Sequence, residues 1–326
     1  MRPPAPFSTF LDEGRAGRLH LAGMTESVDR QGPSARAHAF LWIAVAYLSA
    51  LAVGLVAGIA VLGRHPLEVA WIADVAATLA IFAFSFAFGN SSFYDAYWSV
   101  APVPIAVYWA FASDPAGGVA VPERQGLVLA VLLLWAVRLT ANWARGWQGL
   151  SHEDWRYVDI RQKTGSLYWP ASLVALHGFP TAIVFLGLLP LWLALASGSR
   201  PLGVVDGLAV VVGLAGVALE LVADEQLRRF RRSNPPPEAT CERGLWAWSR
   251  HPNYLGEILV WVSLALFGLA AAGFVWWAWL GAAAMLAMFL FVSIPMKETR
   301  MLARRPGYAE RQRRVSLLLP RPPRRV

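Results

Sequence analysis

The apolar residues of this chain are gathered into long runs, and a helical run of roughly 20 apolar residues crosses the hydrocarbon core of a bilayer. The third run is the shortest and contains Pro102 and Pro104, and a small-residue turn at 271–273 separates the last two. We therefore predict an all-α, polytopic membrane bundle of about eight transmembrane helices. The runs cover about 39–62, 69–88, 97–112, 126–143, 173–196, 204–223, 254–270 and 273–294.

The first 38 residues contain no apolar core and are rich in Gly, Pro and Arg. This composition is typical of a disordered basic tail rather than of a signal peptide. Translation from Met24 would remove most of it. We predict that residues 39–326 form a single transmembrane domain.

Basic residues alternate between the two sides that these runs define. Of the 29 Lys and Arg residues, 25 lie before the first run, after the last run or in the even-numbered connections. The odd-numbered connections hold only Arg64, Arg124 and Arg200. By the positive-inside rule, both termini are predicted to be cytoplasmic, in an inner membrane. Residues 224–253 and 295–326 contain 16 of the 29 basic residues, which concentrates positive charge near the carboxyl end.

The composition agrees with a protein that is surrounded mainly by lipid. Hydrophobic residues make up 56% of the chain and charged residues 15%, whereas soluble domains contain about 25% charged residues. The single cysteine, Cys241, excludes an internal disulfide, and no paired Cys/His spacing predicts a metal site. The net charge of +8 suits nucleic acid, anionic lipid or a phosphorylated ligand. Its position beside the membrane favours the last two, and no nucleic-acid partner is expected.

A few ionisable or polar residues interrupt the apolar runs or flank them. Each ionisable group costs about 2.5 to 3.5 kcal/mol at the centre of a span, so such groups usually face a bundle interior or a wet cavity. All except Asp74 and His177 lie at predicted cytoplasmic ends, and we expect these to meet in one cavity. The set is Asp74, Asp95, Arg138, Asn142, His177, Glu220, Asp224 and Glu257.

One stripe of the sixth run carries Glu220, Asp224, Arg228 and Arg231 at helical spacing. This pattern fits a salt-bridged stem at the interface as well as a ligand-binding face.

The seventh run is preceded by Arg250 and His251, and Pro252 suits its first turn. A helix start flanked by cations is a candidate anion site. An interfacial anchor that includes Trp246 and Trp248 is the alternative. Asn253 and Glu257 share one face, one turn apart.

Two further polar segments allow two interpretations each. The tail after the last run carries Lys297, Arg300, Tyr308 and Arg314, and it suits anionic lipid headgroups or a ligand pocket. The segment Ser92-Phe-Tyr-Asp-Ala-Tyr-Trp98 suits an interfacial aromatic belt. It also holds an acid, Asp95, whose burial among aromatic rings would raise its pKa toward the range useful for proton transfer.

Several of these strings together resemble the steroid 5-alpha-reductase superfamily, in particular a bacterial branch of unknown function. The likeness covers about residues 70–323. A string of the Arg-His-Pro-x-Tyr type alone is also similar to isoprenylcysteine carboxyl methyltransferases. The strings are Arg250-His-Pro-Asn-Tyr-Leu-Gly-Glu257 after Gly244-Leu-Trp, Arg305-Pro-Gly-Tyr308, the 92–98 segment and Glu153-Asp-Trp-Arg-Tyr157.

The resemblance implies a membrane reductase that binds NADPH in its carboxyl-terminal part, residues 204–323, and transfers hydride to a carbon–carbon double bond of a lipid or steroid-like enone that enters from the bilayer. By position, Tyr94, Asp95, Tyr97 and Arg138 become the catalytic candidates. The cofactor-binding residues that the resemblance implies are Asp224, Arg228, Arg231, Arg250, His251, Asn253, Tyr254, Glu257, Lys297, Arg300, Tyr308 and Arg314.

The charge pattern agrees with NADPH, because a diphosphate and a 2′-phosphate require several cationic side chains. The sequence contains no G-x-G-x-x-G, P-loop or H-E-x-x-H motif, which excludes a Rossmann fold and a zincin. Two alternatives remain open. One is a membrane methyltransferase that uses S-adenosylmethionine, and the other is a non-catalytic membrane protein whose basic tail binds anionic lipid.

Overall fold

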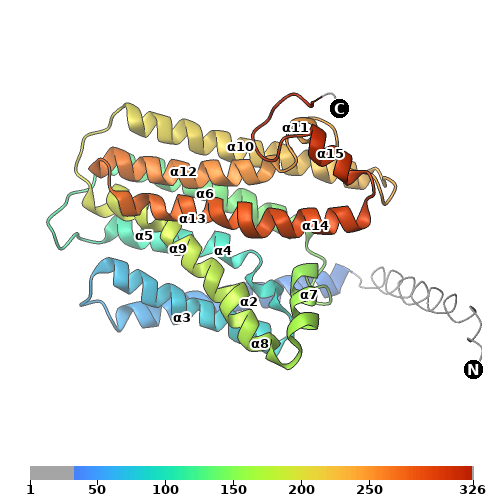
Figure 1. The fold of residues 1–326 in the computed structure, drawn as a ribbon. Coiled ribbons are helices and arrows are strands. Elements are labelled where there is room, and N and C mark those ends of the chain that lie inside the picture. Colours follow the sequence, from blue (N-terminus) through green and yellow to red (C-terminus); the bar gives the residue numbers. More distant parts are fainter. Residues whose placement is uncertain (1–32, 325–326) are drawn as a thin grey trace, which may run out of the picture.

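The structure is a computed structural model that describes residues 33–324, and its long helices run side by side in one bundle (Figure 1). Within these residues the only β pairing is an isolated bridge between Ser249 and Ser316. The all-α fold class is confirmed. The predicted tail lies outside the described residues over 1–32, and residues 33–38 belong to the first described helix.

Seven helical segments in the described part are long and apolar enough to cross a membrane. Two of them, 155–197 and 276–304, are built from several elements, as described below. The seven segments comprise α2 (Pro33–Ile59), α3 (Pro66–Ala87), α6 (Pro122–Gly146), the continuous stretch 155–197, α10 (Val204–Arg232), α12 (Pro252–Ala272) and the stretch 276–304.

The third predicted run differs from the others, since it forms two short helices, α4 (Tyr97–Val100) and α5 (Pro102–Phe111). Pro102 separates them because it lacks the N–H that a continuous helix would use. The run still joins the two ends of the bundle. The Asp95 carboxylate accepts from Tyr157 at one end, whereas Trp109 Nε1 donates to the carbonyl of Pro66 at the other. Residues 33–324 thus contain seven helical segments long enough to span a membrane and one shorter pair of helices, where the sequence predicts about eight spans.

The stretches 155–197 and 276–304 change helix type along their length. Both contain π-helical turns, in which the backbone hydrogen bonds skip one additional residue. The first comprises α7 (Trp155–Thr164), η2 (Gly165–Leu167), α8 (Tyr168–Ala171), η3 (Ser172–Gly178), α9 (Phe179–Trp192) and η4 (Leu193–Ser197), of which η3 and η4 are π-helical. The second comprises η5 (Trp276–Trp279), α13 (Leu280–Met288), the π-helical η6 (Phe289–Ser293) and α14 (Ile294–Arg304). Three short helices lie outside the spans: η1 (Ser91–Tyr94), α11 (Leu245–Trp248) and α15 (Tyr308–Arg314).

Proline and glycine set the ends of α12. Pro252 occupies its first turn, as predicted, and Gly273 ends it with φ +84°, a conformation that favours glycine. Prolines begin α3, α5 and α6 in the same way.

Helices α10 and α12 pack closely because glycines face each other along their contact. A Cβ on Gly216 would lie 2.7 Å from the carbonyl oxygen of Gly256, and a Cβ on Gly256 would lie 2.5 Å from Cγ of Glu220. Such small residues allow two backbones to approach closely in a membrane. The close packing brings the acidic residues of α10 next to those of α12.

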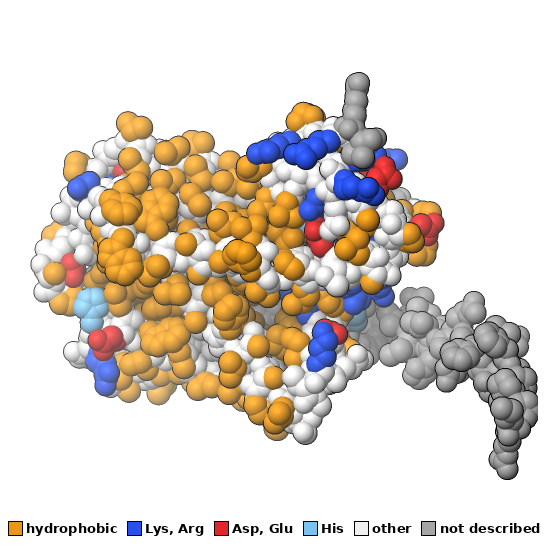
Figure 2. All heavy atoms as spheres, in the orientation of Figure 1, with side chains coloured by type: hydrophobic (Ala, Val, Ile, Leu, Met, Phe, Trp, Pro, Cys, Tyr) orange, Lys and Arg blue, Asp and Glu red, His pale blue; other side chains and the backbone are white. Residues whose placement is uncertain are grey.

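Aromatic and aliphatic side chains together fill the centre of the bundle, and both kinds also lie exposed on its outside. Trp109, Trp135 and Trp261 are almost completely buried. Apolar side chains cover the sides of the molecule, and basic side chains gather mainly at the end that carries α14 and α15 (Figure 2). The start of α2 lies at this same end, where Arg36 donates to the carbonyl of Ala144.

Candidate functional site

The predicted convergence of charged residues occurs around Arg138, on α6. Its guanidinium forms ion pairs with Glu220, with Asp224 at 3.1 Å and with Glu257 at 3.7 Å. The Asp224 carboxylate also accepts from the amides of Asn142, at 2.9 Å, and Asn253, at 3.3 Å. Three helices, α6, α10 and α12, therefore contribute to one polar cluster near the carboxyl-terminal end of the bundle. We call Arg138, Glu220, Asp224 and Glu257 the carboxylate cluster.

The carboxylate cluster is buried and carries more acids than bases. The side chains of Arg138 and Glu220 are 7% and 2% exposed. The Glu257 carboxylate accepts from the indole N–H of Trp135 at 3.1 Å and of Trp261 at 2.9 Å. One guanidinium thus faces three carboxyl groups in a site with little access to water, where an uncompensated charge is costly. The described residues hold no group of His, Cys, Asp and Glu arranged to bind a metal ion.

Glu220, Asp224, Arg228 and Arg231 follow one face of α10, which we call the α10 stripe. Its basic residues, Arg228 and Arg231, lie toward the carboxyl-terminal end of the helix. Arg228 pairs with Glu225, and its Nε atom is buried without a hydrogen-bond partner among the described residues. Arg229, the next residue, pairs with the same Glu225 at 2.9 Å, but its side chain is 77% exposed. Arg231 is exposed at the surface. The structure therefore leaves a buried donor on Arg228.

Arg250 lies outside the carboxylate cluster and binds the carboxyl-terminal tail. Its guanidinium donates to Glu298 at 2.6 Å and to the carbonyl oxygens of Gln312, at 2.8 Å, and Val315, at 2.7 Å. Because these donors are all used within the protein, Arg250 fastens α14 and α15 to the start of α12. We call Arg250 and Glu298 with their partners the tail clamp.

His251 and Tyr308 complete the tail clamp. His251 Nε2 lies 3.1 Å from Glu298, and the Tyr308 hydroxyl donates to the same carboxylate at 3.3 Å. Burial lowers the pKa of His251, and Glu298 offsets this only in part. Burial and the charge of Glu298 raise the pKa of Tyr308 to about 12. Both side chains are therefore neutral at physiological pH and act as hydrogen-bonding groups.

Tyr254 links the tail clamp to the basic side chains of α14. Its ring stacks on His251, with centroids 5.4 Å apart, and on Phe289, at 4.6 Å. Lys297 Nζ lies 4.8 Å from the centre of the Tyr254 ring. The predicted Lys297 and Tyr254 are thus adjacent at this end of the bundle.

Arg300 and Arg314 lie farther out. The Arg300 guanidinium is over the ring of Trp155, 4.2 Å from its centre, and so connects α14 with α7. Arg314 forms an exposed ion pair with Glu310 at 3.6 Å. Neither belongs to the carboxylate cluster.

The catalytic candidates of the amino-terminal half form a second polar group. The Tyr94 hydroxyl lies 2.7 Å from Thr181 Oγ1, which lies 3.0 Å from Thr78 Oγ1. Tyr97 forms a hydrogen bond with Asp74, a buried acid of α3. The sequence marks Asp74 as an acid within a span, but no motif connects it with Tyr97. We call this set the tyrosine group.

Asp95 lies apart from the tyrosine group, at the end of the bundle. It accepts from the Tyr157 hydroxyl at 2.5 Å. Burial raises the pKa of Asp95 to about 6, although the Tyr157 hydrogen bond and the charge of Arg156 lower it. Asp95 is thus an acid poised near neutral pH and held by α7.

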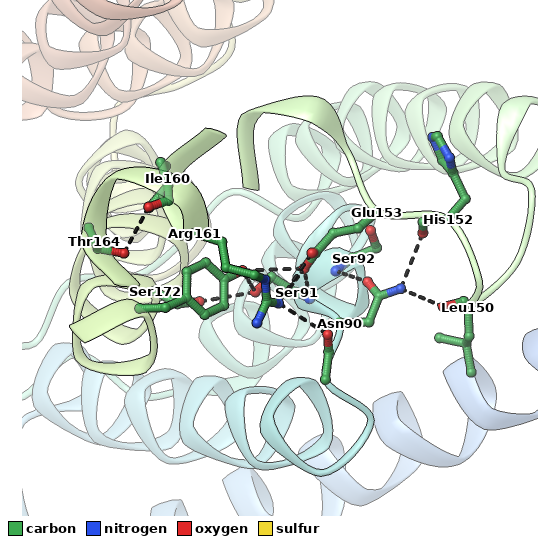
Figure 3. A network of polar contacts seen from close by, with 12 residues as sticks. Asn90, Ser91, Ser92, Leu150, His152, Glu153, Ile160, Arg161, Thr164 and Ser172 are labelled. Atoms are coloured by element: carbon green, nitrogen blue, oxygen red, sulfur yellow. Dashed lines mark hydrogen bonds and ion pairs between the residues drawn. The ribbon is translucent and has the colours of Figure 1, made fainter. Parts of the chain in front are cut away.

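A network of polar contacts fixes the segment that carries Asp95 and Tyr94 (Figure 3). Glu153 accepts from the backbone N–H of Ser91 at 2.8 Å and from Arg161 at 3.2 Å. The Asn90 amide donates to the carbonyl of Leu150 at 2.7 Å. The Glu153-Asp-Trp-Arg-Tyr157 string noted in the sequence therefore contributes Glu153, which holds η1 in place, and Tyr157, which binds Asp95.

The structure thus divides the predicted site residues into separate groups. Arg138, expected with the catalytic tyrosines, lies instead with the cofactor candidates Asp224, Asn253 and Glu257. Trp98 of α4 packs edge to face against Trp135, with ring centroids 5.9 Å apart, and Trp135 in turn donates to Glu257 of the carboxylate cluster. Glu220, Trp135 and Glu298 were not among the predicted site residues. Glu220 was visible as an acid of the stripe, whereas the contact of Glu298 with Arg250 spans 48 positions.

Comparison with known proteins adds a family without an assigned activity. No solved structure matches the chain. An uncharacterised protein of Schizosaccharomyces pombe is 29% identical over 218 residues, which cover 59% of this chain; the chain spans 62% of the length of that relative. Residues 81–315 match a family described as protein of unknown function, DUF1295. Because this match covers well over half of the sequence, the chain belongs to the DUF1295 family.

Proposed function

We propose that the protein is a membrane-embedded reductase that uses NADPH to saturate a carbon–carbon double bond of a lipid or steroid-like enone, as the resemblance to the steroid 5-alpha-reductase superfamily implies. The proposal rests on one observation: beneath a basic surface, Arg138 pairs with Asp224 and Glu257, and Asp224 also accepts from Asn253. By the distribution of basic residues, this end faces the cytoplasm, where the dinucleotide is available.

The residues near the carboxylate cluster fit a phosphorylated dinucleotide. The buried Nε of Arg228 has no partner among the described residues, and a buried donor of this kind gains most from a charged acceptor. Arg231 and Lys297 add exposed cations near it. Arg250 has the different task of holding the tail in the clamp, so its contribution to binding is indirect.

The tyrosine group is suited to polarise the substrate. A bound NADPH supplies a hydride to one carbon of the double bond, and the other carbon takes a proton. When Asp74 is protonated and donates to Tyr97, the hydroxyl proton of Tyr97 is available to a conjugated carbonyl oxygen. A preorganised donor in a dry site stabilises the charge that develops there by several kcal/mol. Tyr94 and Thr181 line the same region.

A methyltransferase that uses S-adenosylmethionine is the second candidate, because the acidic carboxylate cluster also suits a sulfonium cation. Such a ligand carries no phosphate, and it would not require the donors of Arg228, Arg231 and Lys297. The two candidates therefore differ in which ligand binds.

Fluorescence titration of NADPH with purified protein in detergent tests the proposal. Arg228→Ala is expected to weaken NADPH binding at least tenfold, whereas Arg229→Ala is the matched control, since it removes an exposed partner of the same Glu225 and should leave binding near wild type. Equal affinities in the two variants, or binding of S-adenosylmethionine without NADPH, contradict the proposal. Incubation of a lipid extract with NADPH and the protein should then give products two mass units heavier.

A further inference from the structure

The α10 stripe changes sign along its length. Glu220 and Asp224 lie at its inner end within the carboxylate cluster, and Arg228 and Arg231 follow toward the surface. With a rise of 1.5 Å per residue, the stripe extends about 16 Å. It therefore offers an acidic end and a basic end to any ligand that lies along it.

The inner end is negative as long as its acids hold no more than one proton. Arg138 contributes one positive charge against Glu220, Asp224 and Glu257. If Glu220 and Glu257 share one proton, as two close buried carboxyl groups tend to do, the cluster still has one more negative than positive charge. Indole and amide donors from Trp135, Trp261, Asn142 and Asn253 stabilise the carboxylates without neutralising them.

We propose that this negative inner end makes the site discriminate between redox forms, so that it binds the oxidised dinucleotide more tightly than the reduced one. This inference rests on the proposed function. The two forms have the same phosphates for the basic end of the stripe, but only the oxidised form has a positively charged ring. Because the phosphates are common to both forms, a substitution that changes the charge of the carboxylate cluster should change the difference in affinity between them.

Two consequences follow for this enzyme. The carboxylates stabilise positive charge that appears on the ring during hydride transfer, which favours the reaction. The same attraction holds the oxidised product, so its accumulation inhibits the enzyme. Glu220 and Glu257 would thus set how strongly the reduction responds to the ratio of the two dinucleotide forms.

The test compares equilibrium dissociation constants of NADP⁺ and NADPH, measured by calorimetry on the full-length protein in detergent. The wild type is expected to prefer NADP⁺. Asp224→Asn keeps an oxygen for the Asn142 and Asn253 donors and removes one charge even when Glu220 and Glu257 share a proton, and it should lower this preference about tenfold, equivalent to about 1.4 kcal/mol. The double variant Glu220→Gln with Glu257→Gln, which removes that pair together with its shared proton, is the second variant should Asp224→Asn fail to fold.

Asp206→Asn is the matched control. It removes another buried carboxylate of α10, which pairs with Arg124 at the opposite end of the bundle, and it should leave the preference at its wild-type value. Binding of both dinucleotides with a preference for NADPH, or with a ratio that neither cluster variant changes, overturns this inference alone. Absence of binding of either dinucleotide to the wild type overturns it together with the proposed function.

Discussion

Within residues 33–324, Arg138 is the one basic side chain that forms ion pairs with Glu220, Asp224 and Glu257. A buried ion pair adds little to stability compared with apolar residues of the same volume, but loss of one partner leaves the other charge uncompensated. Loss of Arg138 would leave three acidic partners without a cation rather than one. The arginine is therefore a requirement for keeping the acids there, whatever ligand they serve.

Arg138→Met is expected to destabilise the protein by roughly 3 to 5 kcal/mol because it leaves three buried carboxylates without a cation. Addition of Glu220→Gln to Arg138→Met should restore part of the loss, since it removes one of these charges. The measurement is the thermal denaturation midpoint in detergent. If the two substitutions act additively, the ion pairs do not couple the sites as described.

Asp95 provides a pH-dependent prediction. Its pKa is about 6 in the folded protein and 3.8 in a solvated chain, so the folded state holds the proton more tightly. The free energy of unfolding therefore falls as the pH rises through this window and remains lower above it. Asp95→Asn cannot ionise, and relative to wild type it should be about 1 to 3 kcal/mol more stable at pH 7.5 than at pH 4.

Denaturation midpoints of Asp95→Asn and wild type, measured across pH 4 to 7.5, check this. Asp159→Asn, which removes an acid from an exposed pair with Lys163, serves as control. A difference between Asp95→Asn and wild type that does not vary with pH would show that Asp95 ionises as freely in the folded chain as in solution.

At the residue scale, the sequence predicts which side chains are unusual better than it predicts their partners. Asp224, Asn253 and Glu257 stood out because polar groups are rare at the ends of apolar runs, and helical spacing placed them on shared faces. Arg138 was assigned to the tyrosines by position along the chain. Only the packing of α6 against α10 moved it to the acids, and no local pattern encodes that contact.

At the scale of elements, the contact of α10 with α12 depends on glycine. Gly256→Ala would place a Cβ 2.5 Å from Glu220 and 2.7 Å from the Gly216 carbonyl, so the helices must move apart. We expect a loss of about 1 to 3 kcal/mol. Gly207→Ala, also in α10 but facing open space, should instead be neutral or stabilising by up to about 1 kcal/mol. Denaturation midpoints of the two variants check this, and a neutral Gly256→Ala would disprove the tight contact.

The tail clamp makes α14 and α15 depend on Arg250. Arg250→Ala removes the donors to Glu298, Gln312 and Val315, and the chain should become more accessible to trypsin after Arg304. Arg313→Ala, an exposed position of α15, is the control. Faster cleavage in Arg250→Ala alone, followed by mass spectrometry, is the expected outcome, and identical cleavage rates would contradict the clamp.

Element boundaries were predicted well where proline or glycine sets them, as at Pro252 and Gly273. The third run was harder, because its apolar composition resembles a span whereas Pro102 divides it into α4 and α5. The π turns had no counterpart among the predicted elements, since apolar composition does not distinguish them from an ordinary helix.

At the scale of the whole molecule, the two ends of the bundle differ in charge, and this difference predicts how the bundle is oriented in the membrane. The start of α2 and the carboxyl-terminal α15 lie at the end that carries most basic residues, whereas the connection between α5 and α6 lies at the other (Figure 1). From the positive-inside rule we expect the first of these ends to face the cytoplasm.

Cysteine labelling tests the orientation. With Cys241→Ser as background, single cysteines at Ser113→Cys and Ala309→Cys occupy exposed positions at opposite ends. In intact cells a membrane-impermeant maleimide should label only Ser113→Cys, and permeabilisation should expose Ala309→Cys. Labelling of both positions before permeabilisation would contradict a common cytoplasmic location for the termini.

The π turn η3 has a consequence for tolerance to deletion. A π turn contains one residue more than the α-helical turn that it replaces, so removal of one residue within 172–178 would restore a regular helix rather than break it. Because the shortened turn still completes one revolution, the helix on either side of it would keep its orientation. Tyr168, now 2.6 Å from Ser91, would stay within reach of it, and the shortened chain should fold and insert. Deletion of one residue from the regular α6 would instead rotate one flank by about 100°.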